Sequence, residues 1–189
     1  MSMSEWLAFF EQPGPGNTDQ TLEFALDRSR ELGIREVVLA SSTGDTAYKA
    51  LESFKGLRLI VVTYHCGFKE PFQNTMQDDV RRDLKEEGVQ VVRATHALSG
   101  VERSIAKKYG GTCPALLMAD TLRLFGQGTK VAVEIAVMAA DAGTLSGGDI
   151  VAIGGTGRGA DTAVVLRPAN QSNLFDLQIR EIICKPRSF

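Results

Sequence analysis

Apolar residues along the chain follow two alternating patterns, which predict strands and helices in turn. Short and almost continuous apolar runs favour buried strands. These runs cover residues 36–40, 57–63, 89–92, 149–153 and 161–166, and another over 177–184 predicts a terminal edge strand. Between most of the runs, apolar residues recur every three or four positions, as on one face of a helix. The alternation predicts an α/β domain with a mostly parallel sheet covered on both faces.

The connection between the fourth and fifth runs, residues 154–162, contains four glycines and Ala160. It is too short for a parallel crossover, so the strand over 161–166 is expected to run antiparallel. Residues without a bulky side chain let the backbone turn sharply and approach a ligand closely. Arg158 and Asp161 can form charge-assisted hydrogen bonds. The segment is therefore either a glycine-rich hairpin or a binding loop.

Capping and breaking residues mark the helix boundaries. Asn17 with Gln20, and Ser99 with Glu102, have the spacing of a capping box, which predicts the start of a helix at each place. Gly33 can supply the left-handed stop for the first of these helices.

Residues 131–142 are apolar on nearly every face, which predicts a buried helix. Glu134 lies within it, and an unpaired carboxylate is costly to bury. Glu134 is therefore expected either to pair, with Arg103 or Arg158 as candidates, or to face a pocket. Residues 126–129 precede the helix and form either an interhelical turn or a set of N–H donors for a ligand.

Composition narrows the class of protein. The chain has 189 residues, 43% of them hydrophobic, which predicts one domain over residues 1–189 with an aromatic segment and linker at 1–16. A net charge of −2 without a Lys/Arg cluster argues against nucleic acid and anionic membranes as partners. No apolar run approaches the roughly 20 residues that span a bilayer, and residues 1–12 lack the basic residue of a signal peptide. Three cysteines without a CxxC pair predict a reduced, cytoplasmic protein without structural zinc.

Four unusual segments follow predicted strands, at the sheet edge where ligands bind in open α/β folds. They are residues 41–46, 64–68, 95–99 and 154–162. Their shared placement predicts one binding pocket at the carboxyl ends of the strands.

Residues 41–46 combine hydroxyl side chains with the start of a helix. The hydroxyls come from Ser41, Ser42, Thr43 and Thr46. Free N–H groups and the positive end of a helix dipole suit a phosphate. Simple helix capping by one hydroxyl is the alternative. The segment is not a Walker A loop, because no Lys follows at the required spacing.

His65 and His96 are the only histidines, and both lie just past predicted strand ends. They could act as acid and base, although lining of a pocket is the preferred interpretation. No carboxylate stands at motif spacing to either, so we expect no metal site. Phe68 either stacks on a planar ring of a ligand or packs in the core.

Five blocks of the sequence carry a family resemblance. They are SSTGDTA over 41–47, VTYHCGF over 62–68, THALSGVER over 95–103, LRLFGQGTKV over 122–131 and GGTGRGADTA over 154–163. Together they resemble the pyruvate kinase C-terminal-domain-like family of small standalone bacterial and archaeal proteins, over nearly the whole chain. The resemblance implies a three-layer α/β/α sandwich with a five-stranded, mostly parallel sheet whose fifth strand is antiparallel. It also implies that the first and fourth strands lie side by side.

The resemblance implies a binding role as well. In pyruvate kinase this domain is regulatory, and in some members its Ser/Thr–Gly loop holds a phosphate of a sugar bisphosphate effector. Ser42-Thr43-Gly44 with Thr46 is similar to that loop. The chain has no room for the catalytic barrel, so pyruvate kinase activity is not expected. Standalone relatives imply an FMN-type ligand, for which Arg158 is the one obvious cation.

We therefore expect the chain to bind a phosphate-bearing small molecule, either an FMN-like nucleotide or a sugar phosphate. An enzyme that uses His65 or His96 as acid and base is one alternative. Another alternative is a regulatory or interaction module, which could form homo-oligomers. It is suggested by Trp6, Phe9 and Phe10, which must pack on the domain or on a partner. The candidate ligand-binding residues are Ser41, Ser42, Thr43, Gly44, Thr46, Thr63, His65, His96, Gln127, Gly155, Thr156, Gly157 and Arg158.

Overall fold

A computed structural model describes residues 7–189, so Trp6 lies outside the described residues. Seven strands form one sheet in the order β1-β7-β6-β5-β2-β3-β4. β6 is antiparallel to both of its neighbours, and every other neighbouring pair is parallel. The strands are β1 (Ala8–Phe10), β2 (Glu36–Ala40), β3 (Arg58–Thr63), β4 (Gln90–Arg93), β5 (Ile150–Gly154), β6 (Thr162–Arg167) and β7 (Gln178–Pro186).

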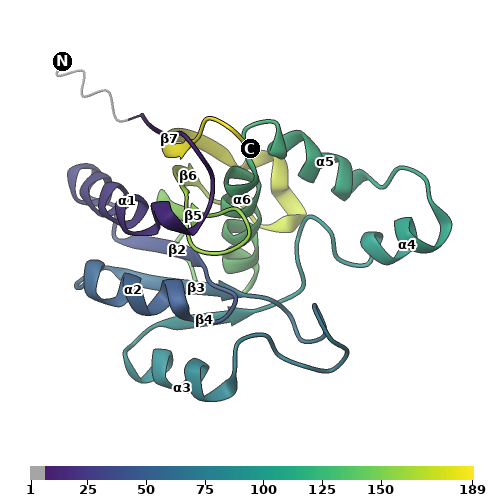
Figure 1. Cartoon of the computed structure of the whole chain (residues 1–189), viewed down its shortest axis with the longest axis horizontal. Helices are drawn as coiled ribbons and strands as arrows, with labels where there is room; N and C mark the ends of the chain where they lie inside the picture. The colour runs from purple at the N-terminus through teal and green to yellow at the C-terminus, as the bar shows by residue number, and fades with distance from the viewer. Residues whose placement is uncertain (1–6) are drawn as a thin grey trace.

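Helices cover both faces of the sheet (Figure 1). On one face α1, α2 and α3 share a hydrophobic core with the strands, and α6 does so on the other. α5 packs against α6, and α4 projects away from the sheet. The helices are α1 (Thr18–Leu32), α2 (Asp45–Ser53), α3 (Asp78–Glu86), α4 (Glu102–Tyr109), α5 (Pro114–Arg123) and α6 (Gln127–Asp141), with short 3₁₀ turns η1 (Pro15–Asn17) and η2 (Gln171–Asp176). The expected three-layer α/β/α sandwich is confirmed.

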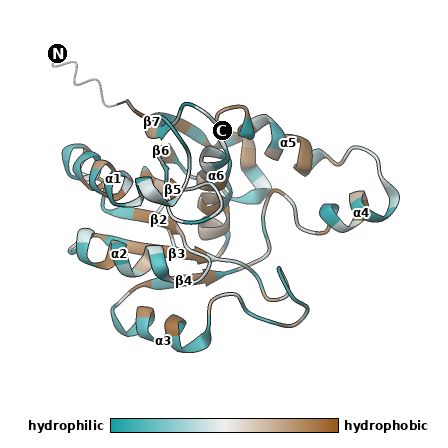
Figure 2. Ribbon diagram, in the orientation of Figure 1, coloured by the Kyte–Doolittle hydropathy of each residue, from teal (hydrophilic) through white to brown (hydrophobic). Residues whose placement is uncertain are grey.

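The strands are apolar on both sides because each side faces a layer of helices. In β2, Val37 and Leu39 join the core beneath α1 and α2, whereas Val38 between them joins the core beneath α6. Hydrophobic residues accordingly lie along the central strands in Figure 2, while the outer helices carry both colours. Within residues 7–189, no helix has both the length and the apolar composition needed to cross a bilayer.

The predicted direction and neighbours of the central strands are confirmed. β6 is the antiparallel strand that follows the short glycine-rich connection, and β5 lies beside β2. The sheet has seven strands where five were expected. The terminal strand β7 is not an edge strand, because β1 pairs with its far side. The described part of the aromatic segment therefore packs on this domain through β1, where the Phe10 ring stacks on Phe24.

Two predicted helix starts use different contacts from those expected. The Asn17 side chain donates to the Gln12 carbonyl and does not cap α1. Glu102 does not close a capping box with Ser99, because its carboxylate accepts the N–H of Ala115, in the first turn of α5, at 2.8 Å.

Helix α6 begins earlier than predicted. Gln127 and Gly128 form its first turn after Gly126, so residues 126–129 are not an interhelical turn. A Cβ atom at Gly128 would overlap with the Thr162 side chain, so only glycine lets the helix approach β6 this closely. That close packing places α6 beside the ends of β5 and β6.

Candidate functional site

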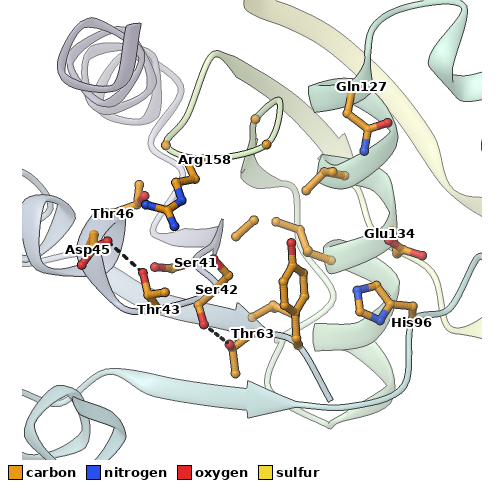
Figure 3. Close-up of a pocket in the computed structure, with 18 of the residues that line it drawn as sticks. Ser41, Ser42, Thr43, Asp45, Thr46, Thr63, His96, Gln127, Glu134 and Arg158 are labelled. Atoms are coloured by element: carbon orange, nitrogen blue, oxygen red, sulfur yellow. Dashed lines mark hydrogen bonds between the residues drawn. The ribbon is translucent and has the colours of Figure 1, made fainter. Parts of the chain in front are cut away.

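A pocket of about 200 Å3 lies at the carboxyl ends of β2 and β3 (Figure 3). Three segments surround it. One is residues 41–46, here called the hydroxyl loop, and the second is residues 155–161, the glycine loop. The third is the side of α6 that carries Gln127, Val131 and Glu134. Because β2 and β5 are neighbours, the hydroxyl loop after β2 and the glycine loop after β5 face each other across the pocket.

The hydroxyl loop uses some of its polar groups to hold its own shape. Ser41 Oγ accepts the Gly44 N–H at 3.2 Å, and Thr43 Oγ1 donates to the Asp45 carboxylate at 2.9 Å. The hydroxyls of Ser42 and Thr46, by contrast, make no hydrogen bond with a described residue. Both residues line the pocket, so their hydroxyls remain available to a ligand.

Gly44 shapes the loop and does not itself line the pocket. Its φ is +112°, a conformation that side chains rarely adopt, and a Cβ there would overlap with Val80 Cγ1. The residue is therefore required for the turn into α2, whose N-terminal end faces the pocket. Thr63, which lines the pocket, fixes the other side of the loop by donating to the Ser42 carbonyl at 3.1 Å.

The glycine loop brings Arg158 to the opposite side. Figure 3 shows its side chain extending toward Thr46 and the hydroxyl loop. The guanidinium forms no ion pair with any residue between 7 and 189. Gly155 and Gly157 also line the pocket, whereas Thr156 does not.

Asp161 explains the shape of the glycine loop. Its buried carboxylate accepts the N–H of Thr156 at 3.1 Å and the N–H of Gly14 at 3.0 Å. The Thr18 hydroxyl accepts the Ala160 N–H at 3.0 Å. The loop is thus anchored to the start of α1, and Asp161 positions it without lining the pocket.

Helix α6 supplies a wall that carries a buried ion pair. Glu134 lines the pocket and pairs with Lys130 one turn earlier, with both side chains 4% exposed. Glu134 also accepts the Leu98 N–H at 3.0 Å. The predicted partners Arg103 and Arg158 were wrong, since helical spacing already places Lys130 beside it. Burial lowers the pKa of Lys130, and the Glu134 carboxylate opposes that shift.

The two histidines meet, but they occupy different positions. Their Nδ1 atoms are 3.1 Å apart, and only His96 lines the pocket. Burial lowers the pKa of His96 to about 4, an effect that Glu134 opposes. The His96 ring is therefore neutral near pH 7 and can accept a hydrogen bond from a ligand.

Most of the predicted site residues meet in this pocket. Those that line it are Ser41, Ser42, Thr43, Thr46, Thr63, His96, Gln127, Gly155, Gly157 and Arg158. Gly44, His65 and Thr156 do not line it. Gln127 reaches the pocket from the first turn of α6, where Arg123 Nε donates to its side-chain oxygen at 2.8 Å.

Sequence reasoning missed several lining residues of two kinds. The apolar members come from strand ends and from α6, and periodicity marks such residues only as core. The others are Tyr64, Asp45 and Gly159, each beside a predicted residue, so adjacency was the available signal. The missed residues are Ala40, Asp45, Val62, Tyr64, Val131, Ile135, Met138 and Gly159. Among residues 7–189, no group of three or more His, Cys, Asp or Glu side chains is placed to hold a metal ion.

Comparison with known proteins identifies the family. Residues 19–166 match the family described as "Pyruvate kinase, alpha/beta domain". Among solved structures, a Cryptosporidium parvum pyruvate kinase in complex with ADP is 14% identical, with a TM-score of 0.41 over 82% of this chain and 24% of that one. An NH3-dependent NAD synthetase from Campylobacter jejuni is 12% identical, with a TM-score of 0.38 over 71% of this chain and 54% of that one. The chain thus spans about a quarter of the pyruvate kinase that it matches. By the match over residues 19–166, it belongs to the pyruvate kinase alpha/beta domain family.

Proposed function

We propose that the pocket binds the phosphate group of a small molecule, either an FMN-like nucleotide or a sugar phosphate. One observation carries the proposal. The hydroxyls of Ser42 and Thr46 and the guanidinium of Arg158, none of which is bonded to a described side chain, face the same space at the N-terminal end of α2. Hydroxyls, an arginine and a helix N-terminus are the donors that hold phosphates in proteins.

Asp45 limits the affinity of this site. It lies in the first turn of α2 and lines the same pocket. Its carboxylate repels a phosphate dianion, and Arg158 alone does not neutralise both negative charges. Asp45→Asn is therefore expected to tighten phosphate binding severalfold, because it removes the repulsion and keeps the shape of the side chain.

The far end of the pocket fits a flat ring better than a second charge. Tyr64 and His96 form that end, and their ring centroids are 5.5 Å apart. FMN carries its phosphate and its ring at opposite ends of a flexible chain, which matches this arrangement. The pocket of about 200 Å3 is smaller than the roughly 300–1,000 Å3 of typical ligand sites, so it accommodates the phosphate end and only part of the ring.

The purified protein is first examined for bound ligand by absorption and native mass spectrometry. Calorimetry then measures the binding of FMN, riboflavin, ribose 5-phosphate and inorganic phosphate. Arg158→Ala should weaken FMN binding at least about tenfold, because a charge-assisted hydrogen bond is lost. Arg167→Ala, an exposed arginine at the other end of β6, is the matched control and should have no effect. Equal affinity for riboflavin and FMN, or no binding of any phosphate compound, would contradict the proposal.

A second candidate function is catalysis by His96. The observation that favours it is a neutral imidazole at the pocket wall, with its Nδ1 held by His65. A phosphometabolite panel is the test, and His96→Gln should abolish turnover while ligand affinity survives. Retention of turnover in that variant would exclude His96 as the base.

A third candidate is an interaction module that forms homo-oligomers. Val101, Ile105 and Tyr109 recur every fourth position around α4 and are 71%, 42% and 74% exposed. A helix with such an apolar stripe favours contact with another protein surface. Light scattering should show a mass above the monomer that falls in Ile105→Glu, and a monomer at all concentrations would exclude this candidate.

We also propose a reducing compartment, such as the cytoplasm. The described cysteines are all free thiols, and Cys66 among them is exposed. Exposed unpaired thiols are typical of proteins kept reduced.

A further inference from the structure

A cluster of flat side chains closes the far end of the pocket. Phe68 stacks on His96, with ring centroids 4.7 Å apart and ring planes at 26° to each other. The centroids of the Phe68 and Tyr64 rings are 4.2 Å apart. Arg103 of α4 lies over the Phe68 ring, with Cζ 5.2 Å from its centroid. Tyr64 and His96 line the pocket, whereas Phe68 does not. Phe68 therefore lies behind the wall, between the pocket and Arg103.

The other walls of the pocket are held firmly. The hydroxyl loop and the glycine loop are each fixed by hydrogen bonds within the loop and to neighbouring elements. Helix α6 is packed on the sheet, and its Ala132 and Ala136 have no exposed surface. Any enlargement of the pocket must therefore come from the wall formed by Tyr64 and His96.

The Leu98 N–H anchors the His96 side of that wall to Glu134, but the side formed by the loop after β3 is held by weaker contacts. The wall joins the loop after β3, which has no helix or strand over residues 64–77, to the segment that leads into α4. The His65–His96 hydrogen bond, the stacked rings and the Arg103 contact connect the two. No residue of α4 is buried, so Arg103 is not tied to the core. Such ring and cation–π contacts are each weak and can be exchanged for equivalent ones.

We propose that Phe68 occupies the place of a ligand's planar ring while the pocket is empty, and that the ring displaces it to stack on His96. This inference rests on the proposed binding of a phosphate compound. Phe68 already lies nearly parallel to His96, as a stacked heterocycle would, and Arg103 would then cover the outer face of the incoming ring. Phe68 thus determines specificity, because a phosphate without a ring binds without moving it.

The experiment compares Phe68→Ala with Phe72→Ala, a control in the same loop whose side chain is 96% exposed. FMN and inorganic phosphate are the probes, with affinities from calorimetry and association rates from quenching of flavin fluorescence. Phe68→Ala should tighten FMN binding and speed its association about three- to tenfold, the equivalent of one aromatic pair. Inorganic phosphate should bind Phe68→Ala as it binds the unaltered protein, and Phe72→Ala should change neither ligand.

The outcomes separate this inference from the proposed function. Weaker FMN binding in Phe68→Ala would make Phe68 a stacking partner of the ring and overturn the inference. Unchanged FMN binding would also overturn it, while phosphate binding in the same protein would leave the proposed function standing. If the unaltered protein bound neither FMN nor inorganic phosphate, both the inference and the proposed function would be overturned. Should Phe68→Ala fail to fold, Arg103→Gln gives an independent reading, because it frees the outer face of Phe68 and should also speed FMN association.

Discussion

His96 combines a position on the pocket wall with an imidazole that resists protonation. Burial, helped by Lys130, His65 and Arg103, lowers its pKa to about 4, and Glu134 opposes the shift. In the unfolded chain the pKa of a histidine is about 6.5, so between these two values the unfolded state binds more protons. Stability should therefore fall as the pH drops from about 6.5 to 4.

This fall in pH should lower the free energy of unfolding by about 1–2 kcal/mol, after allowance for solvent screening of the partly exposed His96 ring. Urea unfolding at pH 7 and at pH 4.5 measures it. His96→Gln, which cannot take up a proton, should show less than half of this difference. An equal difference in both proteins would mean that other groups cause the pH dependence.

The Lys130–Glu134 pair gives a second prediction at the residue scale. Lys130→Met leaves the Glu134 carboxylate buried with the Leu98 N–H as its remaining partner. Removal of one member of a buried pair costs about 3–5 kcal/mol, whereas replacement of both by apolar residues is often neutral. Urea unfolding should show a large loss for Lys130→Met and recovery of most of it in Lys130→Met/Glu134→Leu. Equal stability of the two variants would show that the pair does not act as a unit.

Single residues of the site could be predicted from sequence where their chemistry is visible. Ser42, Thr46 and Arg158 were identified because hydroxyls, a helix start and a lone cation are typical of phosphate sites, and the structure brings them together. The Lys130 partner of Glu134 was missed because Lys130 was placed before the helix. Asp161 was expected to offer a hydrogen bond, but its buried role depends on Gly14, which lies 147 residues away.

At the scale of elements, short and almost continuous apolar runs predicted β2 to β6 correctly, because burial on both faces requires them. β1 was missed since it has three residues and pairs only with β7 at the other end of the chain. The start of α6 was misplaced because glycine is a poor helix former, and here close packing on β6 outweighs that preference.

Gly128 tests that explanation. Gly128→Ala should cost about 2–3 kcal/mol of unfolding free energy, because the added methyl group overlaps with Thr162 although alanine favours helices. Gly16→Ala is the control, since a Cβ there meets nothing within 4 Å. Urea unfolding measures the stability of both variants. A Gly128→Ala protein more stable than the unaltered one would show that helix propensity outweighs packing.

At the scale of the whole molecule, the segment over residues 8–16 connects the C-terminal strand with the glycine loop. β1 pairs with β7, and Asp161 ties the glycine loop to Gly14. Residues 8–16, the described part of the expected aromatic segment and linker, thus help to hold the loop that shapes the pocket.

Asp161→Asn should weaken both stability and phosphate binding. In the unaltered protein the Asp161 carboxylate accepts the N–H groups of Gly14 and Thr156, and the amide N–H₂ of asparagine would face these donors without accepting from them. A loss of about 2 kcal/mol in urea unfolding and severalfold weaker phosphate binding by calorimetry are expected. Asp176→Asn, an exposed aspartate in η2, is the control. If Asp161→Asn lost stability but kept full affinity, the tie to Gly14 would serve folding alone.

The reversed direction of β6 has a practical consequence for protein engineering. Because β5 and β6 form a hairpin, the glycine loop connects them without a crossover helix, and its tip is less constrained than its base. A Cβ at Gly157, at the tip, meets nothing within 4 Å, whereas Gly155 and Gly159 at the base are tightly enclosed. Gly157 lines the pocket and has a φ of +79°, which other residues rarely adopt, so a peptide or a fluorescent reporter is best inserted beside it with Gly157 kept. Such an insertion would turn occupancy of the pocket into an optical signal.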